Sequence, residues 1–186
     1  MAELYLALIH APVYNKHMEK IATSITNLDL HDIARSAATY GVRAYYVVHP
    51  AQTQQDLARR IMDFWREGYG AEYNPHRFEA FRTVRLVSSL EEALTDIRRE
   101  NPDKNVFTVA TDARLYPNSI EYGELRRKME KTEDVIFLLL GTGWGLIREE
   151  IEKTDYILKP IFGEGDYNHL SVRSAAAIIL DRLRGH

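Results

Sequence analysis

Runs of consecutive apolar residues recur along the chain, and between them apolar residues are spaced three or four positions apart. Uninterrupted runs are typical of strands buried on both faces, whereas the wider spacing is typical of helices that pack on one side. The runs predict strands at 4–11, 44–48, 83–87, 106–110, 135–140 and 156–161. Strand and helix therefore alternate from one end of the chain to the other.

Residues that favour helix ends mark the limits of several predicted helices. The first begins with Asp29 as its N-cap and ends before Gly41. A capping-box pair, Ser89 and Glu92, opens another, which Pro102 closes. Further helices are predicted around 57–65, between 145 and 156, at 119–131 and from Ser171 onward.

Residues 69–82 interrupt this alternation and predict an irregular excursion. They combine four aromatic residues with Arg77 and Arg82, a mixture typical of surfaces that stack on bases and contact phosphates. For a second basic cluster, on a predicted helix, a solvated helix face is the favoured explanation over contact with RNA. That cluster consists of Arg126, Arg127, Lys128 and Lys131.

The alternation predicts an α/β fold with a mainly parallel, doubly wound sheet and helices on both faces. The chain has 186 residues and shows no linker, internal repeat or low-complexity segment, so we expect a single domain over 1–186. In such folds, small ligands bind at the carboxyl edge of the sheet.

Composition narrows the classes of function. The net charge is −3, so any contact with nucleic acid needs a local basic patch. The absence of cysteine excludes thiolate catalysis and suits a cytoplasmic protein. No apolar run reaches the roughly 20 residues that a membrane span needs. Seven histidines without a paired spacing argue against a metal site.

Two glycine-containing loops in the last fifty residues, from Asp134 to His186, are the candidates for ligand binding. The first, 141–145, is not a phosphate-binding P-loop, because Leu146 and Ile147 stand where lysine and serine or threonine would follow. Nor does it match the dinucleotide fingerprint, whose last glycine is replaced by Leu146. A tight turn without a ligand remains the alternative.

The second loop carries the most specific text, which runs from Leu158 through Asn168, His169, Leu170 and Ser171 to a stretch of small residues at 174–177. It resembles the last motif of the SPOUT superfamily of RNA methyltransferases, and the turn at 141–145 resembles the motif before it. The whole chain looks closest to the small bacterial SPOUT family that is similar to the catalytic domain of tRNA guanine-N1 methyltransferases.

The resemblance implies a C-terminal deep trefoil knot, S-adenosylmethionine as cofactor, a homodimer, and methyl transfer to tRNA or rRNA at a base nitrogen or a ribose 2′-hydroxyl. Arg35 matches the catalytic arginine of the ribose branch, although Asp29 stands where that branch has asparagine. Asp166 and His169, with Asp112 beside them, are the candidates for a proton-accepting group. The implied cofactor-binding residues are Thr111, Asp112, Leu140, Gly141, Thr142, Gly143, Gly145, Ile161, Gly163, Asn168, His169 and Leu170.

Two other classes of function stay open. The chain could be a nucleotide- or RNA-binding module without catalysis. Asp29, which stands where the ribose branch has asparagine, supports this hypothesis. The chain could also be an α/β enzyme that acts on a small nucleotide, with residues 69–82 as a lid. Binding of S-adenosylmethionine would distinguish the methyltransferase from the enzyme that acts on a small nucleotide. Turnover on RNA would distinguish it from the non-catalytic binding module.

Overall fold

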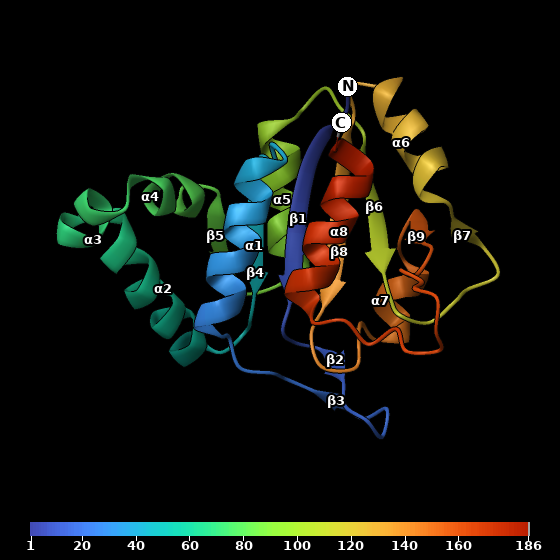
Figure 1. Cartoon of the computed structure of the whole chain (residues 1–186), viewed down its shortest axis with the longest axis horizontal. Helices are drawn as coiled ribbons and strands as arrows, with labels where there is room; N and C mark the ends of the chain where they lie inside the picture. Colours follow the sequence, from blue (N-terminus) through green and yellow to red (C-terminus); the bar gives the residue numbers. More distant parts are fainter. Residues whose placement is uncertain (186) are drawn as a thin grey trace.

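The computed structural model describes residues 1–185 and contains a seven-stranded sheet in the order β5-β4-β1-β8-β6-β9-β7 (Figure 1). Every pair of neighbouring strands is parallel, which confirms the predicted sheet. His186, the last residue of the C-terminal stretch, lies outside the described residues. The strands are β1 (Glu3–Ile9), β4 (Tyr45–Val48), β5 (Val84–Val87), β6 (Val106–Thr111), β7 (Ser119–Ile120), β8 (Val135–Gly141) and β9 (Tyr156–Leu158).

Helices cover both faces of the sheet, as the alternation predicts. Figure 1 shows helices in front of and behind the strands, with the longest helix (52–66) to one side, and the two chain ends meet at the top of the view, where the Arg184 guanidinium donates to the carbonyl of Ala2. The helices are α1 (Asn27–Thr39), α2 (Gln52–Arg66), α3 (Gly68–Tyr73), α4 (Pro75–Phe81), α5 (Leu90–Glu100), α6 (Tyr122–Glu130), α7 (Arg148–Glu152) and α8 (Val172–Arg184).

Strand β1 shows how alternate side chains build two cores. Leu4 and Leu6 belong to a core that also receives apolar residues of α1, α2, α4, α6 and α8. Tyr5 and Ala7 belong to a second core, on the other face, which α5 and α7 cover. Because both faces of the central strands are buried, these strands read as continuous apolar runs in the sequence.

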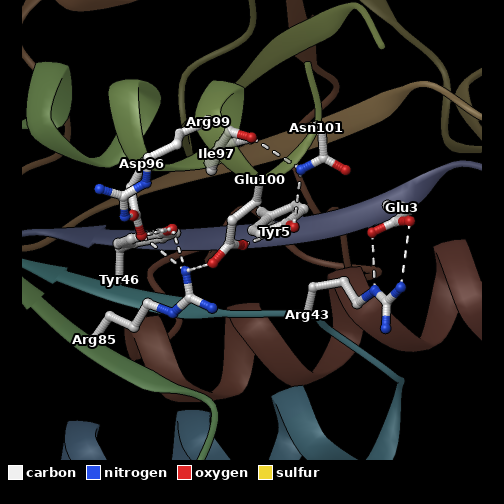
Figure 2. Close-up of polar contacts among 10 residues, drawn as sticks. All are labelled: Glu3, Tyr5, Arg43, Tyr46, Arg85, Asp96, Ile97, Arg99, Glu100 and Asn101. Atoms are coloured by element: carbon white, nitrogen blue, oxygen red, sulfur yellow. Dashed lines mark hydrogen bonds and ion pairs between the residues drawn. The ribbon is translucent and has the colours of Figure 1, made fainter. Parts of the chain in front are cut away.

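A polar network fixes α5 against the second face of the sheet (Figure 2). The Tyr46 hydroxyl donates to the Asp96 carboxylate at 2.7 Å, and Arg85 joins Asp96 at 2.8 Å and Glu100 at 2.7 Å. Burial raises the pKa of Tyr46, so its hydroxyl stays protonated and continues to donate. The tyrosine hydroxyl groups on this face are therefore hydrogen-bonded to side chains of α5 and are not left unpaired.

Two predicted helix limits and one predicted capping bond were wrong. The N-cap of α1 is Thr26, whose hydroxyl oxygen accepts from the Asp29 N–H at 3.1 Å, so the helix begins before Asp29. The segment predicted as a helix at 119–131 begins with β7 at the sheet edge and becomes helical only at Tyr122. Ser89 caps α5 as predicted, but the Glu92 carboxylate reaches the N–H of Ser88 instead of Ser89.

The prediction that 69–82 is irregular was also wrong, because two short helices, α3 and α4, occupy it. Asn74 separates them: its side-chain oxygen accepts from the Arg77 N–H at 3.1 Å, and Pro75 stands in the first turn of α4, where its missing N–H costs nothing. Phe81 is buried against the first core, whereas Tyr69 and Tyr73 stack on one another in the solvent.

Predicted strand ends were also too late in β1 and β9, which stop at Ile9 and Leu158. After β1 the chain forms a small antiparallel hairpin that the apolar pattern did not predict. It comprises β2 (Val13–Tyr14) and β3 (Lys20–Ile21) and lies just beyond the carboxyl ends of β1 and β8 (Figure 1). The hairpin adds a wall to the edge where ligands of α/β folds bind.

Candidate functional site

A cleft of about 850 Å³ opens at the carboxyl edge of β6, β8 and β9. Parallel strands end at the same edge, so the loops after these three strands converge there, joined by the start of α8 and the tip of the β2–β3 hairpin. The volume falls within the range of about 300–1,000 Å³ that small-molecule sites have.

The cleft gathers most of the residues that the sequence singled out. All the predicted cofactor-binding residues line it except Gly163, which lies in the loop after β9 but outside the lining. Asp166 is exposed in the same loop and does not line the cleft either. Arg35 lies on an exposed position of α1, also outside the lining.

The turn at 141–145 depends on its glycines for its shape. Gly143 and Gly145 have φ angles of +60° and +97°, in the left-handed region that side chains disfavour. A Cβ on Gly143 would lie 2.8 Å from the Tyr14 carbonyl oxygen, and one on Gly141 would lie 2.6 Å from the backbone nitrogen of Leu146. The turn therefore presents backbone to the cleft, with few side chains in the way.

A chain of hydrogen bonds anchors this turn to the ends of two other strands. The Thr142 hydroxyl donates to the carbonyl of Ile9 at 3.1 Å and accepts from Thr23 at 2.5 Å. Thr23 in turn accepts from Nδ1 of His10 at 3.1 Å, and its carbonyl accepts from Nε2 of His49. The Thr142 N–H also donates to the carbonyl of Ile9, at 3.2 Å, so both the hydroxyl and the N–H of Thr142 are committed to the fold.

The two histidines in this network are held neutral. The Ala51 N–H donates to Nδ1 of His49, which places the ring proton of His49 on Nε2. His10 is fully buried, and burial together with the neighbouring His49 lowers its pKa to about 4. The network beneath the turn therefore carries no charge at neutral pH.

Asp112 forms the floor of the cleft and is engaged on both carboxylate oxygens. Its side chain is 3% exposed and pairs with Arg114 at 2.6 Å, and the Tyr116 hydroxyl donates to it at 3.1 Å. The hydrogen bond to Asp112 raises the pKa of Arg114, which also donates to the carbonyl of Leu146. Arg114 thereby ties the loop after β6 to the turn after β8.

The loop after β9 closes the cleft from the other side. The Asn168 amide donates to the carbonyl of Ala113 at 2.8 Å, which joins this loop to the loop after β6. Ser171 caps α8 by accepting from the Ser174 N–H at 3.2 Å. Between them, His169 is exposed, and its ring centre lies 6.1 Å from that of Trp144.

Asp29 lies in the lining although it stands outside the C-terminal loops. Its carboxylate accepts from the Thr26 hydroxyl at 2.7 Å, and Arg173 of α8 lies 3.8 Å away. Asp29 therefore helps to join the start of α1 to the start of α8.

Sequence reasoning missed several residues that line the cleft. Arg114 was signalled by its position two residues after Asp112, because a cation beside a buried carboxylate is the expected partner. Trp144 stood inside the glycine turn itself. The hairpin residues Lys16 and Met18 gave no periodic signal at all.

Two features are absent from the residues that the structure describes. Within residues 1–185, no helix is long and apolar enough to cross a membrane. The same residues contain no group of three or more His, Asp or Glu side chains that could hold a metal ion.

Comparison with known proteins identifies a matching family and several relatives. Residues 3–185 match the family described as SAM-dependent RNA methyltransferase. A relative in Aquifex aeolicus, called an uncharacterized protein, is 43% identical over 180 residues, which cover 97% of this chain and 87% of the relative.

A tRNA (guanine-N(1)-)-methyltransferase of Oleidesulfovibrio alaskensis is 42% identical over 182 residues. These residues cover 98% of this chain and 42% of that enzyme, so the chain spans less than half the length of this relative.

Among solved structures, the SpoU methyltransferase AviRb from Streptomyces viridochromogenes superposes with a TM-score of 0.63 at 17% identity, over 97% of this chain and 58% of that chain. At such low identity the likeness concerns the fold alone, and it confirms the SPOUT-like α/β architecture that the C-terminal motif predicted.

Proposed function

Because this chain belongs to the SAM-dependent RNA methyltransferase family, it is an enzyme that methylates RNA with S-adenosylmethionine, and we propose that its substrate is a tRNA and its acceptor a guanine ring nitrogen. The observation that carries the proposal is the family match over 3–185 together with the cleft that collects both C-terminal motifs. The proposed substrate and acceptor atom rest on the similarity to the relative from Oleidesulfovibrio alaskensis, which extends over 98% of this chain.

The cleft fits the cofactor in size and in chemistry. Leu140, Ile161 and Leu170 offer apolar walls. The turn at 141–145 offers backbone at its glycines, where no side chain covers the N–H and C=O of Gly143, although the N–H groups of Thr142, Trp144 and Gly145 already donate within the protein. A nucleoside needs this combination, with apolar surfaces for the ring faces and fixed polar groups for the ring edge. When bound, S-adenosylmethionine supplies a methyl group that its sulfonium already activates.

The remaining task of the protein is to position the acceptor and to take its proton. A guanine ring nitrogen that carries hydrogen must lose it as the new bond to carbon forms, so a base near the acceptor speeds the transfer. Among the three candidates, Asp112 is engaged with Arg114 and Tyr116, and Asp166 lies outside the lining. His169 lines the cleft and is exposed, and we assign the role of proton acceptor to it.

The ribose 2′-hydroxyl, the other acceptor predicted from sequence, finds less support. The ribose branch of the superfamily has asparagine where this chain has Asp29, and the carboxylate of Asp29 already has partners in Thr26 and Arg173.

We also propose that the enzyme is a homodimer in which Arg35 acts in the cleft of the partner. The support is positional: Arg35 matches the first motif of the superfamily, yet it does not line the cleft of its own subunit. An arginine contributed from the partner could bind a phosphate with its two parallel N–H groups.

The trefoil knot and a cytoplasmic location belong to the same proposal. The bond from Asn168 to Ala113 supports the knot, because it lays the last loop across the loop after β6 before the chain enters α8. The cytoplasm is where a tRNA substrate would be met.

The test is methyl transfer from labelled S-adenosylmethionine to unmodified tRNA transcripts, followed by digestion to nucleosides. We expect label in a guanine base, and we expect His169→Gln to lower kcat by about 10²–10⁴-fold while cofactor affinity is kept. Label in a ribose, or no transfer to any tRNA by folded protein that binds the cofactor, would refute the proposed acceptor.

A further inference from the structure

Three aromatic rings that the fold does not need lie together at the cleft. Trp144 and Tyr167 are 56% and 76% exposed, and both line the cleft with His169. The His169 ring centre lies 6.1 Å from that of Trp144 and 5.6 Å from that of Tyr167. Exposed aromatic residues that gather in this way mark an interaction surface, because burying them in the fold would have been favourable.

The backbone holds Trp144 in a fixed position. It stands between Gly143 and Gly145, both in the left-handed region, and its N–H donates to the Tyr14 carbonyl at 2.8 Å. The Gly145 carbonyl accepts from the Tyr14 N–H at 3.0 Å, so the turn is bonded to the hairpin on both sides of Trp144. A ring displayed on such a frame loses little conformational entropy when it binds a partner.

The hairpin tip brings a cation to the cleft that these rings line. The Asn15 side-chain oxygen accepts from the N–H groups of His17 and Glu19 at 2.8 and 3.0 Å, and this clamps the tip. Met18 has a φ of +62°, a conformation that a non-glycine residue adopts only under constraint. The clamped tip carries Lys16 and Met18 into the lining of the cleft.

Lys16 differs from the other lysine of the cleft in its partners. Lys159 lies 2.5 Å from the Glu121 carboxylate, whereas Lys16 has no carboxylate within ion-pair distance among residues 1–185. An exposed ammonium without an anion is available to a phosphate.

We propose that Trp144, supported by His169 and Tyr167, stacks on the acceptor base of the RNA, and that Lys16 binds a phosphate beside it. The proposal rests on the RNA methyltransferase function proposed above. It assigns to the acceptor base the part of the cleft that the cofactor does not fill. Aromatic stacking accepts any base, and the neighbouring phosphate fixes the strand, which is how proteins hold unpaired nucleotides. The stacked base would lie beside His169, the residue assigned to take its proton.

Other occupants fit the observations less well. The adenosine of the cofactor has the apolar walls at Leu140, Val172 and Ile179, which are buried or half-buried, whereas Trp144 and Tyr167 are mostly in solvent. A protein partner would not need a free ammonium in the same cleft.

The first experiment uses fluorescence, because Trp144 and Trp65 are the two tryptophans of the chain. A Trp65→Phe protein saturated with S-adenosylhomocysteine is titrated with unmodified tRNA transcripts. We expect RNA to quench the emission of Trp144 in this protein. In a second comparison, the quench that RNA causes in the wild type should exceed the quench in Trp144→Phe by the same amount. Emission that RNA leaves unchanged in both comparisons would overturn the proposal.

The second experiment separates the RNA from the cofactor. We expect Trp144→Ala to raise KM for the transcripts by about 5- to 150-fold, the effect of losing one stacking partner, and to leave the affinity for S-adenosylhomocysteine unchanged. Trp144→Phe keeps a stacking face and should raise KM by less than about threefold. Lys16→Ala should weaken RNA binding and lower its dependence on salt by about one phosphate contact.

The possible failures are distinguishable. Wild-type protein that transfers no methyl group to any transcript overturns the tRNA proposal and this one with it. Active wild type with an unchanged KM in Trp144→Ala overturns the stacking role alone. A loss of cofactor affinity in Trp144→Ala would assign the rings to the cofactor, and a shift from dimer to monomer in sedimentation would assign them to the subunit contact.

Discussion

Replacing Asp112 by asparagine separates an anchoring role from a catalytic one. The carboxylate oxygens of Asp112 accept from the guanidinium of Arg114 at two positions and from the hydroxyl of Tyr116. Asparagine keeps one oxygen but turns an N–H₂ group toward a partner that can only donate. At least one charge-assisted hydrogen bond is lost, and two donors are brought face to face.

The size of the effect follows from the exposure of the pair. Hydrogen bonds to charged groups contribute about 1.5–3 kcal/mol each, and Asp112 is almost fully buried. Because the Arg114 side chain is 39% exposed, water replaces part of the lost interaction. We therefore expect Asp112→Asn to lower the free energy of unfolding by about 2–3 kcal/mol, or Tm by roughly 4–12 °C in a chain of this length.

The assay combines thermal unfolding, calorimetric titration with S-adenosylmethionine, and single-turnover methyl transfer. If Asp112 anchors the floor of the cleft, stability and cofactor affinity fall and the rate at saturating cofactor changes little. Tyr116→Phe, which removes one hydroxyl from the same carboxylate, should cost about 1 kcal/mol as a matched control. Normal stability and affinity with a rate more than 100-fold lower would refute this reasoning and make Asp112 the base.

The remaining predictions concern the histidine network and the dimer. The folded-state pKa of His10, about 4, lies below its ordinary value of 6.5, so the stability it contributes is complete above pH 6.5 and is lost as the pH falls toward 4. Urea unfolding of the wild type relative to His10→Asn should therefore show a relative loss of about 2–3 kcal/mol between pH 7.5 and 4.5, and a difference that does not vary with pH would contradict the burial of a neutral ring. Thr23→Val breaks the bonds to Thr142 and His10 and should lower both Tm and cofactor affinity, whereas an unaffected affinity would mean that the turn holds its shape without this anchor. If Arg35 acts in the partner's cleft, an equal mixture of inactive Arg35→Ala and Gly143→Arg subunits should regain about a quarter of wild-type activity after exchange, since half of the dimers then hold one complete site; no recovery despite exchange would place Arg35 in its own subunit or outside catalysis.

The sheet could be predicted from the sequence because its strands are buried on both faces. Such burial requires continuous apolar runs, and the run at 135–140 predicted the bounds of β8 to within one residue. The turn at 141–145 could likewise be predicted, because Gly143 and Gly145 have positive φ angles that few other residues adopt. These two signals are local, and local signals survive in a single sequence.

The elements that the sequence did not reveal depend on contacts between distant segments. The β2–β3 hairpin is held partly by the bonds of Tyr14 to the turn at 141–145, so nothing within its own residues marks it. Helices α3 and α4 are short, and α3 keeps Tyr69 and Tyr73 in solvent, so neither helix shows a clear apolar periodicity. The placement of Arg114 and Trp144 at the cleft likewise follows from how the loops meet, a property of the folded chain.

The most direct test of the account is calorimetric titration of three proteins with S-adenosylmethionine: the wild type, Gly143→Arg and Gly163→Arg. Gly143 lies in the lining, where a side chain would meet the Tyr14 carbonyl oxygen at 2.8 Å, whereas a Cβ on Gly163 meets nothing within 4 Å. With all three shown to be folded by circular dichroism, we predict binding by the wild type and by Gly163→Arg, and none by Gly143→Arg. Unchanged binding by Gly143→Arg, or no binding by the wild type, would contradict the assignment of the cofactor to this cleft.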